Sequence, residues 1–93
     1  MCRLMFEYDP DKSAANLAKH KIDFEQAQAL WDDDDRLVIL SPTPGEVRWM
    51  LIGRISGQCW TAVYTNRDGA VRIISVRRSR DNEVKHYDGQ KGD

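Results

Sequence analysis

Residues 58–78 read QCWTAVYTNRDGAVRIISVRR, and this stretch decides the fold. Residues 58–66 alternate between two sets of side chains, which is the pattern of an extended strand with two different faces. Asp68-Gly69 follows, and the glycine tolerates the positive φ that a tight hairpin turn requires. Residues 70–78 are rich in β-branched side chains and form the next expected strand. The stretch therefore predicts a β-hairpin.

Two more strands are expected immediately before this hairpin. Residues 36–40 and residues 46–55 are both rich in strand-forming side chains. The segment SPTPG separates these two strands, and Ser56-Gly57 separates the second from the hairpin. Because links this short join only antiparallel neighbours, the last three strands predict an antiparallel meander.

The N-terminal part predicts a short strand and then a helix. Residues 3–8 partly alternate between apolar and polar side chains. Asp9 is a suitable N-cap, and Pro10 suits the first helical turn because its missing N–H would have no partner there. The helix is expected to run from Pro10 to Lys19 or His20.

Two further helices are expected. Gln26 stands three residues after Asp23, which is the spacing of a capping box, and an apolar stripe continues from there through Trp31. Near the other end of the chain, Ser79 can cap a last helix that runs through about Tyr87.

The order of these elements predicts an α+β domain. We expect an antiparallel sheet of four to five strands, two N-terminal helices and one C-terminal helix, with the helices packed against one face of the sheet. The domain is expected over residues 1–88, with a flexible tail at residues 89–93. A chain of 93 residues can build one modest hydrophobic core.

Several protein classes are not expected. The apolar runs, such as residues 37–40, are far shorter than the roughly 20 residues that cross a bilayer, so no membrane association is expected. Cys2 and Cys59 are the two cysteines, and free thiols in the cytoplasm are the simplest interpretation. No CxxC motif or Cys/His cluster is present, so we expect neither a metal site nor a cofactor.

The net charge of −1 conceals a strong asymmetry along the chain. Residues 1–47 carry 10 acidic and 5 basic side chains, whereas residues 48–80 carry 7 arginines against the single acid Asp68. A basic block inside a nearly neutral chain indicates a local anion-binding site.

The first candidate site lies on the first expected helix. Lys12, Asn16, Lys19 and His20 fall at helical spacing and share one face. A solvated helix face is the simpler interpretation. The alternative is a catalytic site, because imidazole can transfer protons near neutral pH.

The second candidate site is the last hairpin, which holds five arginines and no lysine: Arg67, Arg72, Arg77, Arg78 and Arg80. The guanidinium fork matches phosphate oxygens and is always charged, so phosphate binding is one interpretation. Protection of an edge strand by charge is the other. Simple alternation places Arg72 and Arg78 on one face and Arg77 on the other unless a bulge intervenes.

Two smaller features of the sequence each have two interpretations. Glu46 and Arg48 share a strand face, either as a salt bridge or as a catalytic pair. The acidic run at residues 32–35 is either a solvated end of a helix or a surface that repels nucleic acid and meets a basic partner.

Across residues 5–88 the chain resembles the BrnT family of toxins from bacterial type II toxin–antitoxin systems. The resemblance is carried by an ordered set of motifs: Phe6-Glu7-Tyr8-Asp9, Lys12, Asn16, Lys19-His20, Phe24, Ala27, Glu46-x-Arg48, Gly53, Val63-Tyr64-Thr65-x-Arg67, Arg72-Ile73-Ile74-Ser75-x-Arg77-Arg78, Glu83 and Tyr87. It implies a RelE-like fold and a ribonuclease activity that blocks translation. It also implies a partner, a BrnA antitoxin with a ribbon-helix-helix domain, which carries the toxin to operator DNA.

On this basis we expect a metal-independent endoribonuclease. Lys19 and His20 would move protons, and Arg67, Arg72 and Arg77 would stabilise the transition state. The flanking RNA would be held by Lys12, Asn16, Arg48, Arg78 and Arg80.

Two other functions compete with this expectation. The chain can instead be a toxin-fold binding module whose main task is to hold its antitoxin. Direct DNA binding through the arginine-rich strand is the third possibility, and the acidic N-terminal half and the lack of a recognition helix disfavour it.

Overall fold

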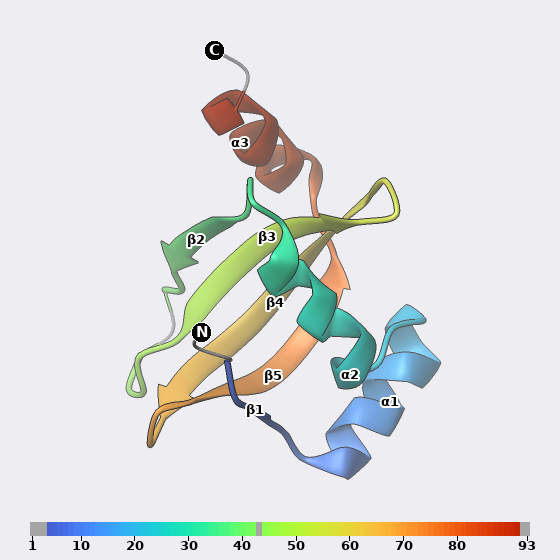
Figure 1. Cartoon of the computed structure of the whole chain (residues 1–93), viewed down its shortest axis with the longest axis vertical. Helices are drawn as coiled ribbons and strands as arrows, with labels where there is room; N and C mark the ends of the chain where they lie inside the picture. Colours follow the sequence, from blue (N-terminus) through green and yellow to red (C-terminus); the bar gives the residue numbers. More distant parts are fainter. Residues whose placement is uncertain (1–3, 43, 92–93) are drawn as a thin grey trace.

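The computed structural model describes residues 4–42 and 44–91. Along the chain the elements are β1 (Phe6–Glu7), α1 (Pro10–His20), α2 (Phe24–Ala27), the 3₁₀ helix η1 (Gln28–Asp32), β2 (Leu37–Leu40), β3 (Trp49–Ile55), β4 (Gln58–Arg67), β5 (Ala70–Arg78) and α3 (Asp81–Lys91) (Figure 1). The α+β fold class is confirmed. No helix in the described ranges is long and apolar enough to cross a membrane.

The five strands form one mixed sheet in the order β1-β5-β4-β3-β2. The meander from β2 to β5 is antiparallel, as expected. β1 instead pairs in parallel with β5, through Phe6↔Val71 and Glu7↔Arg72. The expectation of an all-antiparallel sheet was therefore wrong at this edge, where the strand is too short for its sequence to indicate a direction. The expected start of this strand at residue 3 lies outside the described residues.

Two tight turns join the last three strands. Ser56 and Gly57 have φ of 50° and 83°, and Asp68 and Gly69 have φ of 52° and 82°. Two consecutive positive φ values are the mark of the type I′ turn, whose twist matches that of the flanking strands. The predicted hairpin turn at Asp68-Gly69 is confirmed.

A β-bulge in β5 sorts the side chains of this strand between the two faces of the sheet. Val63 pairs with Ser75 but Tyr64 pairs with Ile73, so Ile74 is an extra residue on β5. The bulge reverses the alternation beyond it. The buried residues of β5 are consequently Val71, Ile73 and Val76 rather than every second residue.

The main core lies between one face of the sheet and the segment formed by α1, α2 and η1. Figure 1 shows α2 lying across the front of the sheet and α1 beside β5. The Trp31 ring packs edge-on against Phe6 at 5.1 Å and Tyr64 at 5.2 Å. At Gly53, a Cβ would lie 3.1 Å from the Leu30 side chain, so glycine is what lets η1 approach β3 this closely.

A second cluster lies on the opposite face of the sheet, under α3. It contains Ile52, Cys59 and Tyr87, with Leu37 and Val84 packed against it. Because Ile52 alternates with the main-core residue Leu51, α3 covers the face that α1 and α2 leave open. The expectation that all helices pack on one face was therefore wrong for α3. Cys59 is a buried free thiol, and Cys2 lies outside the described residues.

The start of α1 and the capping box of α2 are confirmed. Asp9 accepts a hydrogen bond from the Asp11 N–H at 2.9 Å. Asp23 and Gln26 exchange hydrogen bonds of 2.7 and 3.0 Å. The helix expected to continue through Trp31 divides into α2 and η1.

The chain leaves α1 through Lys21, which has a φ of 67°. Its N–H closes the last turn of the helix by donating to the Leu17 carbonyl at 2.9 Å. Glycine is the usual residue at such a position, because a side chain in the left-handed conformation costs roughly 1 kcal/mol. Lysine at this point is therefore a strained choice.

α3 differs from its expected form at both ends. Ser79 does not cap it, because its hydroxyl pairs with that of Thr61 at 2.8 Å and the helix begins two residues later. Glu83 instead binds the Arg80 N–H at 2.7 Å. The helix continues to Lys91, beyond the expected end near Tyr87.

Candidate active site

Three of the candidate arginines lie on the sheet face opposite α1 and α2. Arg72 is paired with Thr65 and Arg77 with Thr61, and both threonines alternate with the main-core residues Ala62 and Tyr64. Arg67 lies two residues beyond Thr65 on the same face of β4. The prediction that Arg77 and Arg72 share a face only if a bulge intervenes is confirmed, since the bulge places them together.

The arginines at one end of this face are paired with carboxylates. Glu46 lies 3.6 Å from Arg48 and 3.5 Å from Arg67, so the predicted pair of Glu46 and Arg48 is a salt bridge that Arg67 shares. Arg67 is 50% exposed, and exposed pairs of this kind are worth only about 0–1 kcal/mol. Arg72 bonds the half-buried Glu7 at 3.0 Å.

Arg77 is held differently. Both of its terminal nitrogens bond the Glu83 carboxylate at 2.8 Å, and the Glu83 side chain is only 7% exposed. The same carboxylate accepts hydrogen bonds from the Thr61 hydroxyl at 3.0 Å and the Arg80 N–H. The bonds from Arg77, and then those from Arg80 and Thr61, lower the pKa of Glu83 to about 2. Glu83 thus stays ionised and fixes the Arg77 guanidinium in place.

The four predicted residues of α1 do not all face solvent. Asn16 is buried, and its amide donates to the Ile22 carbonyl at 2.7 Å and the Val76 carbonyl at 2.9 Å. Its oxygen accepts the Val76 N–H at 3.2 Å. Asn16 thereby provides hydrogen-bond partners for the Val76 N–H and carbonyl, at a part of β5 with which β1 does not pair. Lys12 and Lys19 are exposed and His20 is half-buried.

Arg78 lies apart from the other arginines of β5. It pairs with Trp60 across the strands and stands over the Trp60 ring at 5.8 Å, on the face that carries α1 and α2. It lines a hollow of about 510 Å³ together with Lys21, at the end of α1. Arg80 is exposed at the start of α3. The sheet therefore divides the candidates into two groups. One lies on the α3 side of the sheet, whose part beyond α3 we call the open face, and contains Arg48, Arg67, Arg72 and, beside α3, Arg77; the other lies at the end of α1.

The sequence reasoning missed the carboxylates that hold these arginines. Glu7 and Glu83 lie 65 and 6 residues away from their partners, and Asp88 lies 34 residues from Arg54, with which it forms a salt bridge. The only available signal was the spacing of Glu83 from Arg80, which is that of a helix N-terminal box. In the folded chain, carboxylates therefore neutralise much of the positive charge of residues 48–80.

The acidic run also has a structural role. Asp33 accepts hydrogen bonds from the Tyr87 hydroxyl at 2.6 Å and the Arg54 N–H at 2.9 Å, which ties η1 to α3 and β3. Burial and the Asp33 carboxylate raise the pKa of Tyr87. The interpretation of this run as a purely solvated helix end was therefore wrong for Asp33.

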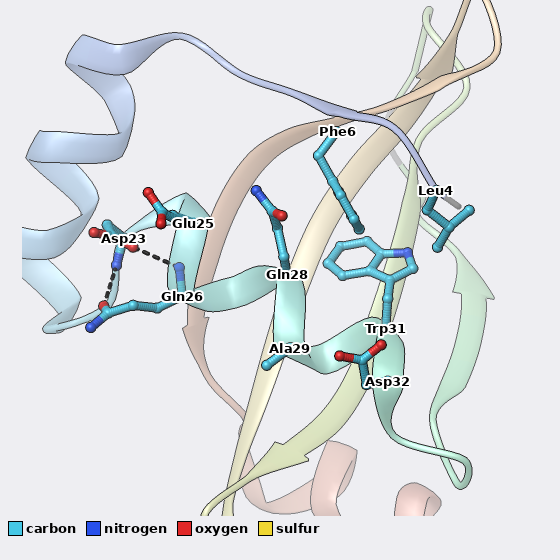
Figure 2. Close-up of a pocket in the computed structure, with 9 residues that line it drawn as sticks. All are labelled: Leu4, Phe6, Asp23, Glu25, Gln26, Gln28, Ala29, Trp31 and Asp32. Atoms are coloured by element: carbon cyan, nitrogen blue, oxygen red, sulfur yellow. Dashed lines mark hydrogen bonds between the residues drawn. The ribbon is translucent and has the colours of Figure 1, made fainter. Parts of the chain in front are cut away.

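A larger, acidic pocket of about 930 Å³ lies on the outer side of α2 and η1. Figure 2 shows Leu4 and Phe6 gathered around the Trp31 indole, with Asp32 beside it. Asp23 and Glu25 also line this pocket, and in the described part of the chain no basic side chain does. It combines an apolar surface with negative charge.

Comparison with known proteins agrees with this arrangement. Residues 8–83 match the model of a family described as the ribonuclease toxin, BrnT, of type II toxin–antitoxin systems. A search of curated proteins finds no match to the chain. The family match covers most of the chain, including α1, the whole β2–β5 meander and Glu83. The chain therefore belongs to the BrnT family of ribonuclease toxins of type II toxin–antitoxin systems.

Proposed function

We propose that this toxin is a metal-independent endoribonuclease that cleaves RNA in the cytoplasm and so inhibits translation. The observation that carries the proposal is the group of arginines on the open face of the sheet, where Arg67 is paired with the exposed Glu46, which a phosphate could replace, and Arg72 with the half-buried Glu7. Arg77 lies on the same face, but Glu83 neutralises it, so its role would be to fix the end of β5.

The chemistry uses the 2′-hydroxyl of the RNA as the nucleophile. His20 accepts the 2′-hydroxyl proton, and the 2′-oxygen attacks the neighbouring phosphorus. The bond from phosphorus to the 5′-oxygen breaks, and Lys19 supplies a proton to that oxygen. Arg67 and Arg72 lie on the other face of the sheet from α1, so they would bind phosphates of the RNA strand that leads to Lys19 and His20 rather than the reacting phosphate. The products are a 2′,3′-cyclic phosphate and a 5′-hydroxyl.

The remaining candidates would hold the flanking RNA. Lys12, Arg48 and Arg80 reach solvent and would bind phosphates, and Arg78 would do so at the end of α1. Asn16 would contribute indirectly, by fixing α1 against Val76 and so setting the position of Lys19 and His20.

The products of the reaction test this proposal. Purified toxin is incubated with single-stranded RNA in EDTA, and the cleaved ends are analysed by mass spectrometry. We expect cleavage without added metal and a 2′,3′-cyclic phosphate on the upstream fragment. A requirement for Mg²⁺, or fragments with a 5′-phosphate, would refute the mechanism.

A type II toxin has a cognate antitoxin, and we propose that this partner is BrnA-like, with a ribbon-helix-helix domain that carries the complex to operator DNA. The acidic pocket supports a basic, amphipathic antitoxin segment as its occupant. Asp23, Glu25 and Asp32 supply the charge, and Trp31 supplies the apolar contact.

Charge-removing substitutions test this docking surface. Glu25→Gln combined with Asp32→Asn should weaken antitoxin binding in calorimetry about tenfold at low salt, and less at high salt. Asp34→Asn, in the same acidic run but outside the pocket, is the matched control. Equal affinity of both variants for the antitoxin would exclude the pocket as the docking site.

The second candidate function is a binding module with weak or no cleavage activity. It is favoured by the neutralisation of Arg48, Arg54, Arg67, Arg72 and Arg77 by carboxylates in the free protein. Induction of the chain alone in bacteria separates the two functions. Arrest of translation supports the ribonuclease, and unimpaired growth supports the module.

A further inference from the structure

The hollow at the end of α1 has a charge that the rest of the sheet lacks. Lys21 and Arg78 line it, and none of the described residues that line it is acidic. Within the described ranges, neither residue forms a salt bridge, whereas the arginines at positions 48, 54, 67, 72 and 77 all do. The hollow is therefore lined by two positive charges that no salt bridge neutralises.

The rest of the lining of this hollow is partly apolar. Ile22, Ile55 and Trp60 supply the apolar part, and Gln26, Ser56 and Gln58 supply hydrogen-bond donors and acceptors. Trp60 is only partly buried, with the Arg78 guanidinium 5.8 Å above its ring. An indole with a stacked guanidinium is the kind of surface on which a nucleobase stacks.

Lys21 adds an independent observation. Its φ of 67° lies in the left-handed region that favours glycine, so any side chain at this position is strained. The side chain present is a lysine that lines the hollow. A strained residue that supplies one of two free charges is better explained by a ligand than by folding.

We propose that this hollow binds one nucleotide of single-stranded RNA, with the base against Trp60 and the phosphate between Lys21 and Arg78. This inference rests on the proposed ribonuclease function and adds a subsite to it. Lys21 directly follows Lys19 and His20 in the sequence, and Arg78 directly follows Arg77. An RNA strand bound in the hollow would therefore pass the edge of β5 towards the open face. An acidic peptide would satisfy the two charges but would leave the Trp60 ring without a planar partner.

A cleavage-resistant RNA tests this subsite directly. The affinity of a short fluorescent 2′-O-methyl oligonucleotide is measured by anisotropy at several salt concentrations. We expect Lys21→Gly and Arg78→Gln each to weaken binding about three- to tenfold, and to reduce the slope of log K against log salt by about 0.7. Lys85→Gln, an exposed lysine of α3, is the matched control and should change neither quantity.

Stability separates a lost subsite from a damaged fold. Because glycine relieves the strain at position 21, Lys21→Gly should raise the Tm by roughly 4 °C while it weakens RNA binding. Lys21→Arg, which keeps the charge, should retain wild-type affinity. Trp60→Phe should retain most of the affinity and Trp60→Leu should lose it.

The outcomes distinguish the subsite from the proposed function. If the wild-type protein binds and cleaves RNA but Lys21→Gly and Arg78→Gln match it, the subsite is wrong and the ribonuclease proposal stands. If the wild-type protein neither binds nor cleaves RNA, both fail. Unchanged RNA affinity with a loss of affinity for an acidic peptide would assign the hollow to a protein partner and overturn the inference.

Discussion

Arg77 and Glu83 form a two-pronged ion pair in which both guanidinium nitrogens lie 2.8 Å from the carboxylate oxygens. The pair joins the end of β5 to the first turn of α3, and Glu83 also binds the Arg80 N–H and the Thr61 hydroxyl. A single carboxylate therefore organises the point where the last strand becomes the last helix. The pair also determines how Arg77 can be tested.

Loss of Arg77 should destabilise the protein as a whole. Arg77→Ala leaves the buried Glu83 carboxylate without its main partner, so we expect the free energy of unfolding to fall by about 3 kcal/mol in urea denaturation. Arg78→Ala removes the neighbouring exposed arginine and should cost less than about 1 kcal/mol. A loss of RNA cleavage in Arg77→Ala is informative only at temperatures where the variant stays folded. Equal stability of the two variants would contradict the structural role of the pair.

Acid should unfold the protein through the same carboxylate. The pKa of Glu83 is about 2 in the folded protein, below the usual value of 4.5. Its stabilising contribution is thus fully present above about pH 4.5 and is lost as the pH falls towards 2. Urea midpoints measured across this range should fall less steeply for Glu83→Gln than for the wild type. Parallel pH profiles would show that Glu83 does not carry this dependence.

Asn16 should be more important for stability than for contact with RNA. Asn16→Ala removes the groups that satisfy the Val76 N–H and two buried carbonyls, at an expected cost of about 2–3 kcal/mol. Hydrogen exchange should speed up selectively at the Val76 amide. Lys12→Ala, an exposed residue of the same helix, is the control and should change neither stability nor exchange.

Tyr87 should stay protonated in the folded protein near pH 10. Burial and the hydrogen bond to Asp33 raise its pKa, so the neutral phenol stabilises the fold below about pH 10, and this contribution is lost as the pH rises further. Burial also raises the pKa of Tyr64, so ultraviolet titration should show tyrosine ionisation that accompanies unfolding in alkali. This change in absorbance should be smaller in Tyr87→Phe, which should also lose about 1 kcal/mol of stability. An unchanged titration curve in Tyr87→Phe would contradict the buried bond to Asp33.

Local patterns predicted most of the fold. The turn at Asp68-Gly69, the capping box at Asp23 and the strands of the meander depend on neighbouring residues, and all are confirmed. The direction of β1 and the position of α3 depend on contacts between distant segments, and these expectations were wrong. The bulge at Ile74 could be named only as a possibility, because an alternating pattern cannot locate an extra residue.

The candidate site was predictable in composition but not in arrangement. The sequence places seven arginines in one block and suggests the salt bridge of Glu46 with Arg48. It does not reveal that Glu7, Glu83 and Asp88 pair with three other arginines of the block. Nor does it reveal that Asn16 points inwards, since helical spacing defines a face but not its surroundings. That Lys21, Trp60 and Arg78 line one hollow is visible only in the three-dimensional structure.

The most direct test of the account is the rate of RNA cleavage in EDTA by His20→Gln, beside the wild type and the control Lys85→Gln. The account predicts that both variants keep the wild-type Tm, that Lys85→Gln cleaves at the wild-type rate, and that His20→Gln is slower by at least about 100-fold. The upstream product of the wild type should end in a 2′,3′-cyclic phosphate. Cleavage by folded His20→Gln at the wild-type rate would contradict the account.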